Sequence, residues 1–240
     1  MTICKMLLLV FLAWCCLAGH AAFAHPHAFV SCTFSFVMDP QGLAGFRQRW
    51  VLDEMTTVSV LDVIDRNRDG ILSPEEEKAL NDLSVNSLRE FGYFTAVRVN
   101  GQPFPVRTIT DFSAELKDHR LIYDFRVPCP VMGVPGRRQK VKVAIYDDSF
   151  YTYVAYAAER NTDIDPSRDP MFANREAPAR PEDFERFARA VGIEKFSGKI
   201  PITGDTDHFK LASRVEDAQD MAYFYGQIVP QTFVLEFEPR

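Results

Sequence analysis

Apolar and polar residues alternate with a period of two along much of the chain beyond residue 28, a pattern typical of strands with one buried face. The alternating runs come in pairs, and short turn sequences such as DPQG and NGQP separate the two members of a pair. The pattern predicts successive hairpins, and therefore an antiparallel sheet or a sandwich. The predicted pairs are 29–38 with 45–52, 94–99 with 104–109, 113–116 with 121–127, and 141–146 with 151–157.

A helical pattern interrupts the strands after the first hairpin. Val60, Leu61 and Ile64 share one face of an incoming helix, and apolar residues recur at roughly helical spacing from Leu80 to Phe91. We therefore expect an α+β fold that is mainly β, in which a helix-loop-helix is inserted at about 54–91. We expect residues 25–240 to form a single domain.

The segment between the two helices, DRNRDGILSPEE at 65–76, fits a twelve-residue EF-hand loop position by position. Gly70 at its sixth position permits the sharp turn, and hard oxygen ligands at this spacing suit calcium. Ser73, Pro74 and Glu76 also form a helix start, with a capping box around a proline at the first helical position. The predicted calcium ligands are Asp65, Asn67, Asp69, the Ile71 carbonyl, Ser73 and Glu76.

The C-terminal third is less regular. Residues 158–180 are polar and rich in turn formers, which indicates a long surface connection. Short helices are predicted at 181–191 and 212–226, where apolar residues approximate helical spacing. A final strand at 233–237 is expected to tie the C-terminus into the sheet.

The first 24 residues have the pattern of a secretory signal peptide. Lys5 precedes the apolar run MLLLVFLAWCCLA, which is short for a membrane span, and Ala22-Phe23-Ala24 is an A-x-A cleavage site. We expect cleavage after Ala24 and export to a bacterial periplasm. No second long apolar stretch follows, so no transmembrane segment is expected in the processed chain.

Charge and cysteine content restrict the function classes. Without residues 1–24 the chain has 26 basic and 33 acidic residues, a formal charge of −7, which argues against nucleic-acid binding. Cys32 and Cys129 remain after cleavage, and in an oxidising compartment they either pair as a disulfide or stay buried as inert thiols. Nucleophile elbows, phosphate-binding loops, CxxC pairs and HExxH helices are absent, so no catalytic residue is assigned and no enzyme is expected.

Cleavage after Ala24 would make His25 the first residue, so that its α-amine and imidazole, with the His27 imidazole two positions on, offer three nitrogen ligands. Pro26 has no N–H, which prevents the usual square-planar copper or nickel chelate that needs a deprotonated second amide. The remaining ligands suit nickel, cobalt, zinc or copper. The alternative is a polar terminus without a role. Additional candidate metal ligands are His119 in LKDHRL and His208 with Asp207 in TGDTDHF.

Two other clusters leave alternatives open. The tyrosines at 146, 151, 153 and 156 belong either to a half-buried sheet face, which is the more common case, or to a ligand groove. RWVLDE at 49–54 places Trp50, Asp53 and Glu54 either at a strand that ends in a polar bend or near a site.

Four segments in this order, HPHAFV at 25–30, RWVLDEM at 49–55, the loop at 65–76 and IYDDSFYTY at 145–153, resemble the periplasmic family called domain of unknown function 1007. The resemblance covers most of the chain beyond residue 24. It implies a periplasmic component of an uncharacterised ABC-type transport system, in some cases associated with nickel/cobalt-type permeases. The AFV after HPH departs from the bulkier run ending in an acid that the family leads us to expect.

These observations lead to three hypotheses about the function of the protein. The leading hypothesis is an exported accessory protein that passes nickel, cobalt, zinc or copper from His25 and His27 to an inner-membrane permease, with calcium in the 65–76 loop. The alternative is a calcium-stabilised, β-rich binding or scaffold module without a transition-metal role. A copper enzyme built on the N-terminal histidine ranks below both, because such sites place the second histidine far away in sequence.

Overall fold

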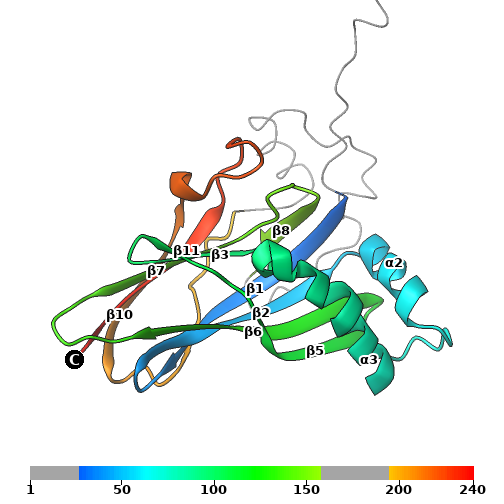
Figure 1. Ribbon diagram of the computed structural model, residues 1–240, viewed down its shortest axis with the longest axis horizontal. Coiled ribbons are helices and arrows are strands. Elements are labelled where there is room, and N and C mark those ends of the chain that lie inside the picture. The colour runs from blue at the N-terminus through cyan, green and yellow to red at the C-terminus, as the bar shows by residue number, and fades with distance from the viewer. Residues whose placement is uncertain (1–26, 158–194) are drawn as a thin grey trace, which may run out of the picture.

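The computed structural model describes residues 27–157 and 195–240, and about half of these residues lie in the strands of two β-sheets (Figure 1). The predicted leader at 1–24, His25, the connection at 158–180 and the predicted helix at 181–191 lie outside the described residues. No helix in 27–157 or 195–240 is long and apolar enough to cross a membrane.

The first sheet has six strands in the order β5-β6-β2-β1-β8, with β9 also paired to β1. The first and third predicted hairpins are confirmed as β1–β2 and β5–β6, both antiparallel. β8 and β9 run parallel to β1, along its first and last residues respectively, so this sheet is mixed. Its strands are β1 (Ala28–Asp39), β2 (Gly42–Leu52), β5 (Thr110–Lys117), β6 (Arg120–Met132), β8 (Thr152–Tyr156) and β9 (Ile202–Gly204).

The second sheet has five antiparallel strands in the order β10-β11-β7-β3-β4. A hairpin is present around Asn100-Gly101 as predicted, but its outgoing strand is Gln102–Phe104, so the strand predicted at 104–109 is wrong beyond Phe104. Pro103 and Pro105 both lack the N–H that a longer ladder needs. The strands are β3 (Thr95–Val99), β4 (Gln102–Phe104), β7 (Gln139–Ile145), β10 (Phe209–Asp217) and β11 (Gln231–Pro239).

The hydrophobic core lies between the two sheets. Phe34 of β1 stacks on Phe233 of β11 with ring centroids 4.4 Å apart, and Phe36 and Phe46 pack around Phe34. Period-two alternation places these residues on the inner face, because successive side chains of a strand point to opposite sides. The sandwich alternative of the prediction is therefore the correct one.

A helical unit, residues 54–94, is inserted between β2 of the first sheet and β3 of the second and lies beside β5 and β6 (Figure 1). It contains α2 (Glu54–Ile64), α3 (Pro74–Leu80), a π-helical turn η1 (Asn81–Val85) and a 3₁₀ segment η2 (Asn86–Phe94). The outgoing helix is thus less regular than predicted. Two hydrogen bonds attach the unit to the sheet, from the Leu121 amide to the Thr57 hydroxyl and from the Ala114 amide to the Glu77 carboxylate.

The fourth predicted hairpin is wrong, because its two strands belong to different sheets. β7 pairs with β3 and β11, whereas β8 pairs with β1. Asp147 redirects the chain between them: its carboxylate accepts bonds from the Ser149 amide and hydroxyl and from the Thr152 amide. A turn sequence alone does not distinguish a hairpin from a change of sheet.

The helix predicted at 212–226 is also wrong. Residues up to Asp217 form β10, and only Gln219–Met221 form a 3₁₀ turn, η4. Leu211 lies opposite Phe237 and Val215 opposite Phe233 in the ladder with β11. Pairing with a neighbouring strand therefore outweighs the approximate helical spacing, whereas the final strand predicted at 233–237 is confirmed within β11.

Cys32 and Cys129 are free and buried. In the first sheet Cys32 of β1 pairs with Trp50 of β2, which pairs in turn with Tyr123 of β6, so Cys32 and Tyr123 lie in one row across the sheet. Cys129 is six residues further along β6, or about 20 Å at the usual rise of a strand. A disulfide needs Cα atoms within about 7 Å, so this fold supports the inert-thiol alternative.

We expect both thiols to resist modification in the native protein. Burial raises the pKa of Cys129 from 9.0 to about 12 and raises that of Cys32 as well. Because the thiolate is the nucleophile, native Cys129 should react with 5,5′-dithiobis(2-nitrobenzoic acid) at pH 8 roughly a thousandfold more slowly than in denaturant. Since these pKa values are raised by folding, the thiols should stabilise the protein below pH 9.0 and lose that contribution as the pH rises toward 12. Mass-spectrometric mapping of the labelled cysteines makes the measurement, and rapid native labelling of Cys129 would contradict the burial.

Candidate functional site

The 65–76 loop connects α2 to α3, and its polar side chains bind the loop's own backbone. The Asn67 side-chain oxygen, Oδ1, accepts a bond from the Asp69 amide at 3.1 Å, and the Asp69 carboxylate accepts one from the Ile71 amide at 2.8 Å. Gly70 has a φ of +72°, in the left-handed region that glycine adopts without strain. The loop therefore makes the sharp central turn that the motif predicts.

Asp65 is the most buried acid of the loop, with 8% of its surface exposed. One carboxylate oxygen, Oδ2, accepts a bond from the Gly70 amide at 3.1 Å, whereas Oδ1 has no hydrogen-bond partner. A buried carboxylate oxygen without a partner is costly, because burial removes the water that would otherwise bind it. Asp65 Oδ1 is therefore the atom at which a cation would bring the largest gain.

Glu76, at the last position of the loop, takes part in a capping box with Ser73. Its Oε2 accepts bonds from the Ser73 amide at 3.0 Å and the Ser73 hydroxyl at 2.8 Å, and the Glu76 amide bonds back to the Ser73 hydroxyl. This confirms the predicted helix start. Binding of calcium through both Glu76 oxygens requires that this carboxylate leave the capping box.

Among the described residues no three His, Cys, Asp or Glu side chains are close enough together to hold a metal ion. In the loop the acids are instead separated by bonds to backbone amides. The donor set nevertheless fits calcium in kind, because Asp65, Asn67, Asp69 and Ser73 offer only oxygens toward a cation and Ile71 offers a carbonyl. The calcium site stays a prediction.

The structure divides the predicted histidines between the two ends of the first sheet. His27 precedes β1, its amide donates to the Tyr151 carbonyl at 2.8 Å, and its ring lies 4.9 Å from that of Tyr151. β1 and β6 run in the same direction on either side of β2. His119 lies in the exposed turn before β6, and therefore at the same end of the sheet as His27. His208 and Asp207 follow β9, which pairs with the opposite end of β1.

His208 and Asp207 are exposed, and the His208 imidazole lies 3.3 Å from the Asp205 carboxylate. An ion pair between exposed groups contributes little to stability. The two residues cannot join His27 in one metal site, because the length of β1 separates them.

RWVLDE is a structural junction in this fold. Trp50 is buried and donates to the Gln48 side chain at 2.9 Å. Asp53 caps α2 by accepting a bond from the Thr56 amide, and its second oxygen accepts bonds from the Thr56 hydroxyl and the Phe29 amide. The carboxylate thus joins α2 to β1, with both of its oxygens engaged in these bonds.

The tyrosines do not form one surface. The Tyr156 hydroxyl binds the Ile145 amide and carbonyl and the Gln231 carbonyl, so a β8 side chain connects the first sheet to β7 and β11. Tyr146 stacks on Tyr223 beside the second sheet, with ring centroids 4.4 Å apart. Tyr151 is the member of the cluster that lines a cavity.

That cavity, which we call the aromatic cavity, has a volume of about 390 Å³ and lies between the first sheet and the helical unit. Its aromatic lining consists of Trp50, Phe91, Phe94, Tyr123 and Tyr151. Tyr123 was not recognisable as a lining residue from the sequence, because β6 and η2 meet only in the folded chain. Only the short spacing between Phe91 and Phe94 is visible in the sequence.

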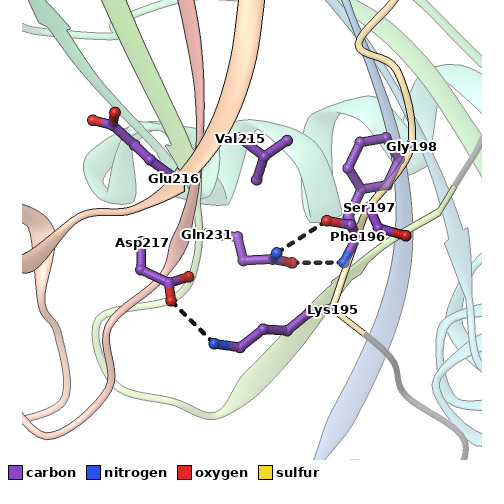
Figure 2. Close-up of a pocket in the computed structure, with 8 residues that line it drawn as sticks. All are labelled: Lys195, Phe196, Ser197, Gly198, Val215, Glu216, Asp217 and Gln231. Atoms are coloured by element: carbon purple, nitrogen blue, oxygen red, sulfur yellow. Dashed lines mark hydrogen bonds and ion pairs between the residues drawn. The ribbon is translucent and has the colours of Figure 1, made fainter.

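A second hollow, of about 380 Å³, lies where residues 195–198 pass β10 and β11 (Figure 2). Several of its polar groups bind one another. The Gln231 amide accepts a bond from the Phe196 N–H at 2.8 Å and donates to the Phe196 carbonyl at 3.1 Å, and Lys195 lies 3.1 Å from the Asp217 carboxylate. We interpret this hollow as the attachment of the segment that leads into β9.

Comparison with known proteins gives the family. The sequence profile described as "Protein of unknown function (DUF1007)" matches residues 10–191, which is more than half of the chain. The chain belongs to this family. The match to DUF1007 includes the helical unit, the 65–76 loop and every residue that lines the aromatic cavity, and it ends before β9, β10 and β11.

Two relatives are similar to parts of this DUF1007 chain. A protein of Haemophilus influenzae (strain ATCC 51907 / DSM 11121 / KW20 / Rd), described as "Uncharacterized protein", is 26% identical over 145 residues, which are 59% of this chain and 67% of that protein. The "Uncharacterized 15.5 kDa protein in trpE 3'region" of Spirochaeta aurantia is 29% identical over 93 residues, which are 38% of this chain and 64% of that protein.

Proposed function

We propose that this protein is an exported calcium-binding module in which the 65–76 loop holds the ion and stabilises the helical unit on the sandwich. The observation that carries the proposal is Asp65, a buried carboxylate at the first ligand position with one oxygen that has no hydrogen-bond partner. The other loop positions at which an EF-hand carries its calcium ligands also hold oxygen donors, and Gly70 makes the required turn.

The chemistry of the loop suggests a weak structural site. Bound calcium would supply a positive charge to Asp65 Oδ1 and join the oxygens of Asp69 and Glu76, which lie on either side of the turn. Arg66 and Arg68 are exposed in the same loop and reduce its negative field. Single extracellular sites of this kind have dissociation constants of about 10⁻⁴–10⁻³ M.

Calcium should raise the thermal stability of the protein. At 5 mM calcium, chosen to exceed the dissociation constant, mass action predicts about 1–2 kcal/mol of stabilisation. A protein of this size should then melt several degrees higher than in EDTA. Differential scanning calorimetry in calcium, in magnesium and in EDTA makes the measurement, and an equal melting temperature in all three would contradict the proposal.

Matched variants locate the effect in the loop. Asp65→Asn and Glu76→Gln each remove a ligand charge and keep the side-chain shape, so both should abolish the calcium-dependent increase. Glu75→Gln changes the neighbouring acid of the first turn of α3, which is exposed, and Asp82→Asn removes a charge from η1. Both control variants should retain the full increase.

A second candidate function concerns transition metals. We propose that His25 and His27 bind nickel, cobalt, zinc or copper and pass the ion to an inner-membrane permease. The observation in its favour is that His27 and His119 lie at the same end of the first sheet, so that an additional imidazole is near the start of β1. A copper-dependent oxidative activity at these histidines ranks below metal transfer.

Titration of the processed protein with each metal tests this candidate. Binding should weaken below the imidazole pKa of roughly 6.5, because protons compete with the metal for the ring nitrogens. His25→Ala/His27→Ala should abolish binding, and His208→Ala should not change it. Equal affinity of the double variant would leave the calcium module as the function.

A further inference from the structure

The aromatic cavity lies where the helical unit covers the inner face of the first sheet. Val30, Trp50 and Tyr123 line it from β1, β2 and β6, while Val60 and Leu88 line it from α2 and η2. Cys32, Trp50 and Tyr123 occupy one row across the register, so Trp50 and Tyr123 are neighbours on the same face. The cavity therefore has a rigid wall of sheet and a second wall of helix.

The walls are suited to a flat apolar molecule. Trp50 and Phe94 are nearly parallel, with an interplanar angle of 14° and ring centroids 6.0 Å apart. Phe91 and Tyr151 line the opening with 63% and 53% of their surfaces exposed. Aromatic rings in such positions interact with a ligand ring in offset or edge-to-face contact. The volume of about 390 Å³ lies within the usual range for small-molecule sites.

One polar group on the wall has unused hydrogen-bonding capacity. The Tyr123 side chain is 95% buried, since 5% of its surface is exposed, and among the described residues its hydroxyl makes no hydrogen bond of good geometry, although the Ser84 side chain lies close enough to interact with it. Ser84 also lines the cavity; burial raises the pKa of Tyr123 and the contact with Ser84 lowers it by less, so the hydroxyl is protonated at neutral pH. The hydroxyl can therefore donate to, or accept from, a ligand.

The cavity offers no free charge. Asp147 is the acid among the lining residues, and both its oxygens are already bound by Ser149 and Thr152. An ionised ligand would lose its hydration without gaining a free counter-charge, which is unfavourable in an apolar surrounding. A neutral ligand avoids this cost.

We propose that the aromatic cavity binds a small, uncharged aromatic molecule whose single hydroxyl or carbonyl group bonds to the Tyr123 hydroxyl. This site is independent of the calcium proposal, because none of its lining residues belongs to the 65–76 loop. The ligand ring lies against Trp50 and Phe94, and its polar group is at the Tyr123–Ser84 end.

Isothermal titration calorimetry of the purified full-length protein with 2-naphthol tests the site. We expect saturable binding of one molecule per chain. Tyr123→Phe removes only the hydroxyl and should weaken binding about tenfold, the effect of one lost hydrogen bond in a buried site. Val60→Trp fills the helix side of the cavity and should abolish binding.

Tyr146→Phe is the matched control, because it removes the same atom from a tyrosine outside the cavity and should leave the affinity unchanged. Circular dichroism confirms that each variant is folded, and the conservative Tyr123→Phe keeps the test decisive if Val60→Trp does not fold. Titrations in calcium and in EDTA separate the two proposals, since binding in both media supports the cavity whatever the loop does.

Several outcomes would overturn the proposal. These are absence of saturable 2-naphthol binding in both media, binding that neither Tyr123→Phe nor Val60→Trp alters, and tighter binding of decanoate than of 2-naphthol. The last result would assign the cavity to an acyl chain. Concentration-dependent dimerisation that Val60→Trp abolishes, without 2-naphthol binding, would assign it to a second copy of the chain.

Discussion

Asp53→Ala should destabilise the protein by about 3 kcal/mol, measured as the change in the free energy of unfolding by urea denaturation. The Asp53 side chain is 2% exposed and makes three hydrogen bonds. Loss of the cap of α2 costs about 1 kcal/mol, and the Phe29 amide left without its acceptor costs about 1–3 kcal/mol more. The same carboxylate attaches α2 to β1, so the variant should also loosen the helical wall of the aromatic cavity.

Two variants separate this junction from a general effect of charge. Asp53→Asn keeps one acceptor but turns an N–H group toward one of the three donors. Its free energy of unfolding should therefore lie between those of the wild type and Asp53→Ala. Asp62→Ala removes an exposed carboxylate from the same helix and should change the free energy of unfolding by less than about 0.5 kcal/mol. Equal stability of Asp53→Ala and Asp62→Ala would show that the junction contributes nothing.

Gly45→Ala should destabilise the protein by about 3 kcal/mol or more. Gly45 lies at the bulge where β2 changes register against β6, and its φ is +150°. A Cβ atom there would lie 2.3 Å from the Val127 carbonyl oxygen and 3.1 Å from the Cys129 amide nitrogen. These are backbone atoms in the middle of the sheet, so relief of the clash requires separation of two paired strands.

Gly136→Ala is the control for the clash. Gly136 also has a positive φ, of +70°, but an added Cβ there would meet no atom within 4 Å. It should cost only the roughly 1 kcal/mol of a left-handed alanine. Thermal and urea unfolding of both variants make the comparison, and a Gly45→Ala protein no less stable than Gly136→Ala would contradict the close packing of β2 on β6.

The helical unit connects the two proposed sites in one structural element. Its α2–α3 connection is the 65–76 loop, and residues of α2, η1 and η2 form one wall of the aromatic cavity. Thr57 and Glu77 of this unit, together with Asp53 just before it, make side-chain hydrogen bonds to the first sheet. A shift of α2 on calcium binding would therefore change the shape of the cavity, which the titrations in calcium and EDTA detect.

Features that depend on neighbouring residues were readable from the sequence. The β1–β2 hairpin follows from alternation on either side of a turn, and the Ser73–Glu76 capping box follows from residues three apart. The turn at Gly70 likewise needs only its own residue type. In each case the interacting groups are close in the chain, so their residue types and spacing contain the information.

Only the tertiary structure decided which distant strands pair and which side chains meet. β7 and β8 read as a hairpin but lie in different sheets, and 212–226 reads as a helix but begins as β10, because pairing with β1 and β11 determines the outcome. The same pairing separates Cys32 from Cys129 and brings Tyr123 beside Trp50. Such contacts depend on strand order and register, which local spacing does not encode because strands of the same pattern can pair in many orders.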